Sequence, residues 1–316
     1  MVDTHSHGHE AQTGTKRQKI AVLVIHGLGN QESGYAEEFT RPIYKGLMDH
    51  WAGDPRNPAD DIVFQPVYWA PLLQWRQNDL LLRFDTHFKL DYRPLRRLFA
   101  GYLGDVFAYQ PTPQHGDAYD LVHECLAESL TAAAAKVGPE APLVIVGHSL
   151  GGVIAFNHFF ELQFGHGCGY SCANAQHWRD SELPLVRGET LAGLYTIGTP
   201  LALWTVRFLD SGEAIRVPAP NFSHHYPGVG GEWINLFDVD DIIAWPLRCV
   251  NAHFAAAVTE DREVQSGGLF TGWNPAVHET YARCEAVIDT VVQGIVRLYE
   301  RVNPRPDAPA GSRPGP

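Results

Sequence analysis

The sequence predicts an α/β protein in which a mostly parallel central β-sheet carries helices on both faces. Short apolar runs rich in β-branched residues recur along the chain, as is typical of strands buried on both faces. Longer helical segments separate these runs, as the crossovers of a parallel sheet require. The predicted strands are 20–25, 61–69, 143–146, 191–197, 233–237 and 256–264, and the principal helices are 35–51, 117–136, 150–164 and 279–301.

One domain is predicted over residues 19–301, between a polar segment (1–18) and a proline-rich segment (302–316) that have the composition of disordered tails. Residues 70–115 carry apolar side chains interleaved with arginines and are too many for a simple connection. We expect a helical, cap-like insertion there that offers an apolar wall to a substrate. The alternative is that these helices pack on the edge of the sheet. Residues 165–188 predict a loop excursion, because they are rich in glycine, cysteine and polar residues.

Composition argues against several classes of function. The net charge is −12 and lysine and arginine form no stripe, so we expect no nucleic-acid partner. No apolar run approaches membrane-spanning length, and the first residues lack the apolar core of a signal peptide, so we expect no transmembrane segment and a cytoplasmic location. Among the five cysteines only Cys168 and Cys172 are closely spaced. They could form a disulfide or bind a metal, but no second pair accompanies them, so we expect reduced thiols and no metal.

The segment LVIVGHSLGGVIAF (143–156) is the most informative stretch of the chain. A buried strand stops at Gly147, Ser149 follows at the turn, and an apolar helix continues after Gly151. This order of strand, G-x-S-x-G turn and helix is the nucleophile elbow, in which the serine hydroxyl stands clear of the backbone. The alternative is a chance match in a glycine-rich chain, but the strand and helix around the motif favour a catalytic Ser149.

The first predicted strand ends in the sequence HGLGN (26–30), where glycines allow the backbone to approach a ligand closely. In hydrolases with a nucleophile elbow, one oxyanion donor is the amide after the serine and the other comes from such a loop. The predicted donors are therefore the amides of Leu150 and Leu28. We also expect His26, Gly27 and His148 to lie against the substrate. The alternative for His26 and Gly27 is an ordinary strand–helix turn.

A serine hydroxyl needs a base, and the base needs a carboxylate that orients it. In folds with this elbow the chain order is serine, acid, histidine. After the acidic cluster that ends the strand 233–237, only His253 and His278 remain. His253 lies in the helical run NAHFAAAV, whereas His278 follows a loop, so His278 is the predicted base.

Three aspartates compete for the role of the triad acid. Asp238 directly follows the strand, and its side chain would be fixed by the pleat. Asp240 lies further into the turn and is followed by one residue, two aliphatic residues and a nearby proline. We therefore favour Asp240 over Asp238, and both over Asp241.

The sequences VIHGLGN, VGHSLGG, TIGTP, INLFDVDDIIAWPL and NPAVHETY together resemble the α/β-hydrolase superfamily, in its lipase-like serine esterase branch. The resemblance spans about residues 19–300. It implies the α/β-hydrolase fold, Ser149 as nucleophile, His278 as base, an acid within 238–241, and no cofactor. The insertion at 70–115 matches no subfamily pattern, which leaves the substrate open.

The expected function is hydrolysis of a small-molecule carboxylic ester with an apolar acyl group, through an acyl-enzyme intermediate. Acyl transfer or thioester cleavage by the same triad is an alternative reaction. A non-catalytic binding protein that kept the fold is a third possibility, and a complete triad argues against it.

Overall fold

The structure is a computed structural model. It describes residues 17–27, 34–55, 57–87, 91, 104–112, 117–166, 171–208, 212–267 and 275–304. Its centre is a six-stranded sheet in the order β2-β1-β3-β4-β5-β6, and every neighbouring pair is parallel. The strands are β1 (Ile20–Ile25), β2 (Ile62–Val67), β3 (Leu143–His148), β4 (Leu191–Ile197), β5 (Glu232–Phe237) and β6 (Glu260–Glu263). The α/β class and the parallel sheet predicted from the sequence are confirmed.

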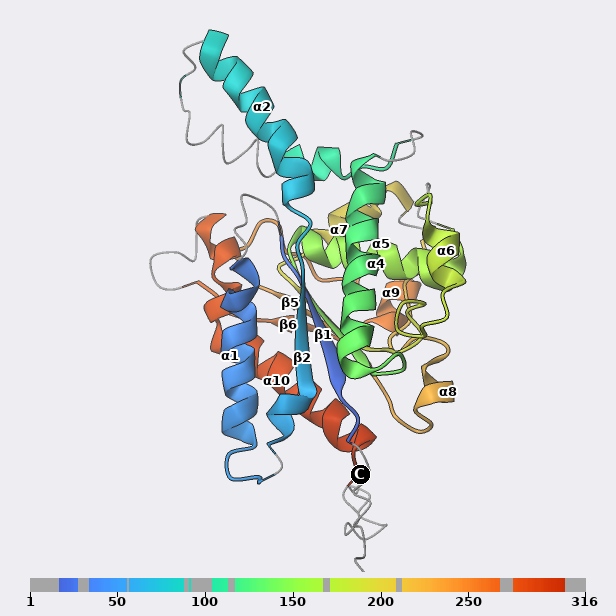
Figure 1. The fold of residues 1–316 in the computed structure, drawn as a ribbon. Helices are drawn as coiled ribbons and strands as arrows, with labels where there is room; N and C mark the ends of the chain where they lie inside the picture. Colours follow the sequence, from blue (N-terminus) through green and yellow to red (C-terminus); the bar gives the residue numbers. More distant parts are fainter. Residues whose placement is uncertain are drawn as a thin grey trace, which may run out of the picture.

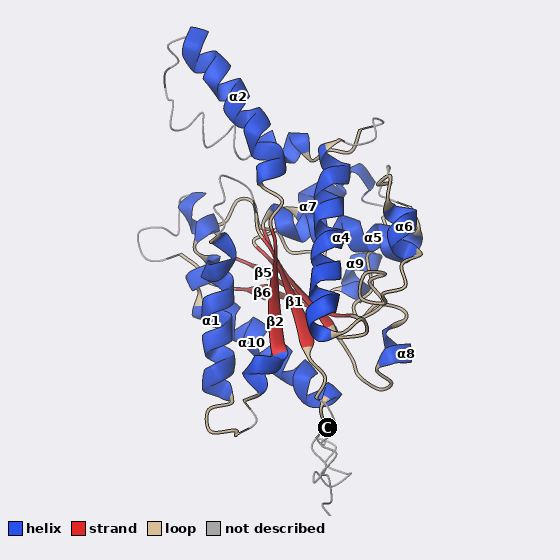
Figure 2. Ribbon diagram, in the orientation of Figure 1, coloured by secondary structure: helices blue, strands red, loops and turns tan. Residues whose placement is uncertain are grey.

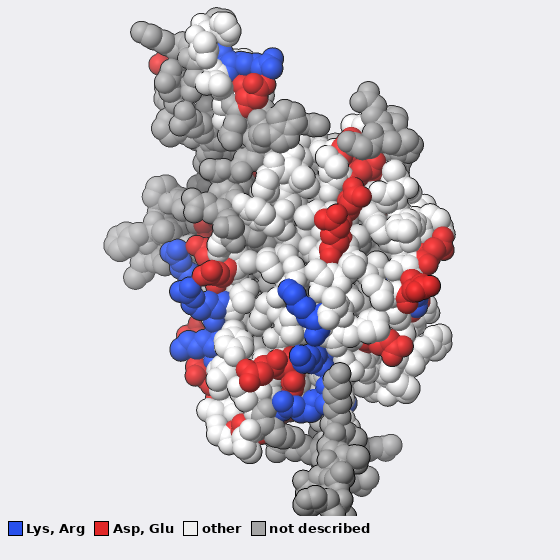
Figure 3. Space-filling view, in the orientation of Figure 1, with Lys and Arg blue, Asp and Glu red and all other residues white. Residues whose placement is uncertain are grey.

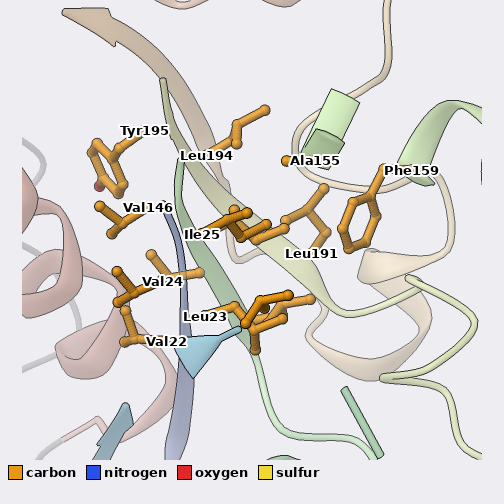
Figure 4. Packing of buried hydrophobic residues seen from close by; sticks show 14 of the residues in the cluster. Val22, Leu23, Val24, Ile25, Val146, Ala155, Phe159, Leu191, Leu194 and Tyr195 are labelled. Atoms are coloured by element: carbon orange, nitrogen blue, oxygen red, sulfur yellow. The ribbon is translucent and has the colours of Figure 1, made fainter. Parts of the chain in front are cut away.

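The central strands are apolar along their whole length because both of their faces are covered. Every residue of β1 and β4 is buried, and so are the first five residues of β3. In Figure 4, Val22 and Val24 point to one side of the sheet, while Leu23 and Ile25 point to the other, toward Phe159 of the helix after β3. This alternation explains why an unbroken apolar run, and not an alternating one, was the signal for these strands.

Two pairs of helices sandwich the sheet (Figures 1 and 2). Helices α1 (Tyr35–His50) and α10 (Glu285–Val302) contact each other on one face, while α4 (Ala118–Val137) and α5 (Leu150–Phe164) cover the other. Asp117 caps α4, because its side chain accepts a hydrogen bond from the Asp120 amide. The shorter elements are η1 (Pro58–Asp61), α6 (Ala175–Arg179), α7 (Leu201–Trp204), η2 (Thr205–Phe208), α8 (Phe222–His225), α9 (Ala252–Ala257), η3 (Pro275–Glu279) and η4 (Tyr281–Arg283).

Helix α2 (Pro71–His87) forms the first part of the predicted insertion and projects away from the sheet (Figure 1). Its side chains Leu80, Leu82 and Phe84 are exposed. The chain rejoins the body at residues 104–108, which are helical, and at Tyr109, which is fully buried. Much of 88–103 lies outside the described residues, so the interpretation of this insertion as a cap stays a prediction.

Two element boundaries differ from the predictions near the C-terminal part of the sheet. Strand β6 is shorter than predicted, because Asn251 caps helix α9 by accepting hydrogen bonds from the amides of His253 and Phe254. Helix α10 begins at Glu285 and not at 279, because the short turns η3 and η4 precede it. His278 therefore lies on a 3₁₀ turn, just ahead of the long helix.

The two ends of the fold meet at the N-terminal edge of the sheet. The Gln18 amide donates a hydrogen bond to Asn303 Oδ1 over 2.7 Å, and Asn303 Nδ2 donates to the Gln18 carbonyl oxygen over 3.0 Å. The opposite edge carries the residues that follow the strands. In a parallel sheet these residues gather in one place, so the loops after β1, β3, β4 and β5 lie together.

The surface carries interspersed charges. On α1, Arg41 pairs with Glu37, and Lys45 pairs with Asp49, one helical turn apart in each case. The face seen in Figure 3 shows basic and acidic side chains side by side over this helix, without a continuous basic stripe among the described residues. In the described part of the chain, no helix combines the length and the hydropathy needed to cross a membrane.

Candidate active site

Ser149 occupies a sharp turn between β3 and α5. Its backbone has φ 54° and ψ −126°, a conformation that side-chain-bearing residues rarely adopt and that indicates strain held by the surroundings. A Cβ on Gly147 would lie 2.9 Å from the Gly152 Cα, and one on Gly151 would lie 2.2 Å from the Ile25 carbonyl oxygen. Glycine is thus required at both flanks, because the helix starts in direct contact with the ends of β3 and β1.

A hydrogen-bonded chain of three side chains runs through the site. The distance from Ser149 Oγ to His278 Nε2 is 2.8 Å, and that from His278 Nδ1 to Asp241 Oδ2 is also 2.8 Å. All three residues are buried. A carboxylate only accepts, so the imidazole proton lies on Nδ1 and leaves Nε2 free to accept from the serine hydroxyl. The predicted pairing of Ser149 with His278 is present in the structure.

The prediction that Asp240 faces His278 is wrong; the carboxylate there belongs to Asp241. After β5 the chain makes a tight turn in which the Asp241 amide donates to the Asp238 carbonyl oxygen over 3.1 Å. The tip of this turn, Val239 and Asp240, is exposed, while Asp241 returns to the interior. The predicted acid, Asp240, is thus one residue too early in the chain: it lies at the tip of the turn and not at its return.

Asp241 is held as an ion. Burial by itself raises the pKa of Asp241, but hydrogen bonds from His278, a backbone amide and a tyrosine hydroxyl act in the opposite direction, and the pKa lies below its usual value. The carboxylate can therefore stabilise a positive charge that forms on His278.

Asp238 performs a different task on the same turn. Its Oδ1 accepts from the Asp240 amide at 3.0 Å, and its Oδ2 accepts from the Ser266 amide at 2.6 Å and from the Ser266 hydroxyl at 3.0 Å. Ser266 lies between β6 and η3, the turn that carries His278. Asp238 therefore ties the turn of the acid to the loop of the histidine.

The oxyanion side of the site is described in part. Leu150 is the first residue of α5, and the amides of a first helical turn have no acceptor within the helix. Gly27 lies directly against the serine, since a Cβ there would be 2.4 Å from the Ser149 Cβ. The loop after β1 thus reaches the serine, as predicted. Leu28, the other predicted donor, lies outside the described residues.

Two histidines expected at the substrate lie next to the serine loop: His26 is buried and directly precedes Gly27, and His148 is half-buried and directly precedes Ser149. His26 stacks on Trp69 with centroids 4.7 Å apart and donates from Nδ1 to the Gly27 carbonyl oxygen over 2.6 Å. Burial lowers the pKa of His26 to about 4, although the bond to the Gly27 carbonyl acts in the opposite direction. This ring therefore stays neutral near pH 7. Its contact with substrate stays a prediction.

His148 lies directly behind the histidine of the triad. Its ring stacks on that of His278 with centroids 5.1 Å apart, and its Nε2 donates to the His278 carbonyl oxygen over 3.1 Å. Burial, with a smaller contribution from the charge of His278, lowers the pKa of His148 to about 3. His148 is therefore a neutral ring that holds the backbone of His278.

Comparison of the chain with protein-family models, with curated proteins and with solved structures finds no match. Within the described ranges, no group of three or more histidine, cysteine, aspartate or glutamate residues is arranged to hold a metal ion.

Tyr281 is the site residue that the sequence argument missed. It lies three residues after His278, within the quoted sequence NPAVHETY, and its hydroxyl donates to Asp241 Oδ2 over 3.0 Å. A short turn brings residues three apart onto one side, so this spacing was the available signal.

The arrangement supports one kind of chemistry: transfer of a proton from Ser149 to His278, with Asp241 stabilising the imidazolium that results. This makes the serine hydroxyl a nucleophile. The start of α5, with its amides and the positive end of its dipole, adjoins the position where an oxyanion would form.

Proposed function

We propose that the chain is a serine hydrolase of the α/β-hydrolase superfamily, in its lipase-like esterase branch, and that it cleaves carboxylic esters with an apolar acyl group. The observation that carries the proposal is the buried chain from Ser149 through His278 to Asp241, which starts at a serine on a strained strand–helix turn. The all-parallel sheet and the chain order of serine, acid and histidine also support it.

In the proposed mechanism Ser149 Oγ attacks the ester carbonyl carbon while His278 Nε2 takes the hydroxyl proton. The tetrahedral intermediate collapses, the C–O bond to the alcohol breaks, and His278 returns the proton to the leaving alcohol. A water molecule then attacks the acyl-enzyme; His278 takes its proton and gives it back to Ser149 as the acid leaves. The amides of Leu150 and Leu28 are the proposed oxyanion donors.

Exposed apolar side chains near the same edge of the sheet support an apolar acyl group. Val239, at the tip of the acid turn, and Ile242, directly after it, are 64% and 74% exposed. Leu203 and Val206, in the segment after β4, are also exposed, and so is Trp245. A surface of this composition favours acyl chains over charged or sugar-like groups.

The proposal is tested with Ser149→Ala on a panel of p-nitrophenyl esters graded by acyl length. Loss of the nucleophile in a serine protease costs about a million-fold in kcat, so we expect turnover to fall to background. Ser223→Ala, at an exposed serine on α8, is the matched control and should keep full activity. Wild-type protein should also react with a fluorophosphonate at Ser149 alone.

Retained activity in Ser149→Ala would contradict the proposal, and absence of fluorophosphonate labelling would favour the non-catalytic alternative. An added alcohol separates hydrolysis from acyl transfer, because only a transferase diverts most of the acyl group to the alcohol. A thioester in the panel addresses the remaining reaction. The absence of a cofactor and of a nucleic-acid partner, and a cytoplasmic location, stay predictions.

A further inference from the structure

Tyr281 is held rigidly between the acid turn and the histidine. Its side chain is fully buried in turn η4, and its Oη accepts a hydrogen bond from the Asp238 amide over 2.9 Å. Gly198, at the end of β4, packs on the ring so closely that a Cβ there would be 2.6 Å from Cε2. Strand β4, the β5 turn and η4 together therefore fix the position of the hydroxyl.

The hydroxyl of Tyr281 and the ring of His278 use the same oxygen of Asp241. Oδ2 accepts from His278 Nδ1 at 2.8 Å and from Tyr281 Oη at 3.0 Å, whereas Oδ1 accepts from the Ile243 amide at 3.0 Å. A second donor on one carboxylate oxygen disperses its charge. The ion then attracts a positive imidazole less strongly than it would with His278 as its only side-chain donor.

The direction of the bond follows from the surroundings of the tyrosine. Burial, with the charge of Asp241 adding to it, raises the pKa of Tyr281 well above its usual value. The hydroxyl therefore keeps its proton. Because the Asp238 amide occupies the oxygen as a donor, the proton of Tyr281 points to Asp241.

We propose that Tyr281 is a positioning residue of the triad: its hydroxyl aims Asp241 Oδ2 at His278 and limits the basicity of that histidine, so that it sets the lower pH limit of activity. This inference rests on the proposed function. It concerns how the site is tuned and not which reaction it performs.

The other titratable groups around His278 and Asp241 are neutral, exposed or bound to other partners. The tuning of His278 is therefore assigned to Tyr281. His148, from β3, stacks on His278 as a neutral ring, and His26, from the end of β1, is also neutral near pH 7. The Asp238 carboxylate accepts from Ser266 and the Asp240 amide, and Asp240 is exposed at the tip of the turn. Of the ion pairs in the described ranges, the one with His278 is the only one that involves Asp241.

The test is the pH profile of kcat/KM for Tyr281→Phe. Without the hydroxyl, Asp241 stabilises protonated His278 more strongly, so a higher pH is needed to free the base. We expect the acid midpoint of the profile to rise by about 0.5 to 1 pH unit, which corresponds to a three- to tenfold change in the proton equilibrium. The plateau of kcat should fall about three- to thirtyfold, because Asp241 is less well aimed, while KM changes little.

Two further proteins keep the test decisive. Tyr119→Phe is the matched control: it removes the hydroxyl of another buried tyrosine, which donates to Glu161 between α4 and α5. The acid midpoint of its pH profile should stay in place. Replacing Tyr281 by 3-fluorotyrosine keeps its shape but makes the hydroxyl a stronger donor, so the midpoint should move to lower pH. This isosteric change gives a result even where Tyr281→Phe does not fold.

The outcomes separate this inference from the proposed function. If wild-type protein hydrolyses esters and neither replacement of Tyr281 moves the midpoint, the inference is overturned and the proposed function stands. If wild-type protein neither hydrolyses the ester panel nor reacts with the fluorophosphonate, the proposed function fails, and with it the basis of the inference. Shifts in opposite directions for phenylalanine and 3-fluorotyrosine support it.

Discussion

Among the described residues are two buried clusters with histidines, and their hydrogen-bonded chains end on different groups. At the C-terminal edge of the sheet, Ser149 donates to His278, which donates to Asp241. Between α4 and α5, Tyr109 Oη lies 2.9 Å from His123 Nε2, and His123 Nδ1 lies 3.1 Å from His158 Nδ1. One chain ends on a carboxylate, and the other ends on a second histidine.

The direction of the second chain follows from its first member. Asn157 Nδ2 donates to Tyr109 Oη over 3.1 Å, so the tyrosine proton points to His123 Nε2 and the proton of His123 lies on Nδ1. Burial, with His158 adding to it, lowers the pKa of His123 well below its usual value, and burial lowers that of His158 to about 3. Both rings therefore stay neutral near pH 7.

Glu161, which lies on α5 three residues after His158, does not act as an ion partner for these rings. Glu161 accepts from the Tyr119 hydroxyl at 2.6 Å and from the Cys172 amide at 2.8 Å, and no hydrogen bond in the described part of the chain joins it to either histidine. Burial raises the pKa of Glu161 to about 6, although these two bonds oppose the rise. The comparison shows that burial alone keeps a histidine neutral. A histidine that acts as a base requires a carboxylate ion in contact with its ring.

The sharpest test of this comparison removes the ion partner. Asp241→Asn should lower kcat by about four orders of magnitude, as the equivalent change does in a well-studied serine protease, because the amide leaves His278 in the wrong tautomer. Asp240→Asn is the matched control and should stay near full activity, since Asp240 is exposed on the turn. A collapse of activity in Asp240→Asn with retention in Asp241→Asn would reverse the assignment of the acid.

The second test asks whether the two clusters serve different purposes. His123→Ala removes a fully buried ring and leaves Tyr109 Oη and His158 Nδ1 without this partner, so we expect the free energy of unfolding in urea to drop by about 2–4 kcal/mol. Activity per folded molecule should not change. His253→Ala, at an exposed position of α9, should alter neither quantity. A stable but inactive His123→Ala protein would show that the second cluster takes part in the reaction.

The smallest expected effect lies in the pH dependence of stability. Between pH 6.5 and about 3 the unfolded chain binds a proton at His158 that the folded protein does not bind. The stabilising contribution of neutral His158 to the free energy of unfolding is therefore fully present above pH 6.5, and it is lost as the pH falls. In His158→Gln, the rise of the unfolding free energy from pH 4 to 6.5 should be shallower by up to about 1.4 kcal/mol per pH unit. The exposed His224→Gln should keep the wild-type slope.

The sequence was sufficient for those parts of the fold and the site that depend on local pattern. Unbroken apolar runs identified the strands, and the glycines around Ser149 identified the turn, because a buried strand and a close backbone approach each restrict residue type. His278 followed from chain order, since few histidines remained after the acids.

The rest depends on contacts that no local pattern encodes. The choice of Asp241 over Asp240 is made by the closing bond between the Asp241 amide and the Asp238 carbonyl. The chain from Asn157 to His158 joins α5 to α4 and to Tyr109 at the end of the insertion, so it exists only once three distant segments have packed. The role of the insertion as a cap stays a prediction, because much of 88–103 lies outside the described residues.

The pairing of Gln18 with Asn303 bears on how the protein can be engineered. The described chain enters and leaves the fold at one point, the Gln18–Asn303 pair beside the start of β1, whereas Ser149 follows the opposite, C-terminal end of β3. Fusion partners or surface tethers joined directly at residues 17 or 304 would therefore be attached at the end of the sheet opposite the serine. Gln18 and Asn303 are also close enough to be bridged by a short linker, with new ends opened at the exposed Gly228. In such a circular permutant the order of the elements along the chain changes, while the neighbours of every strand stay the same.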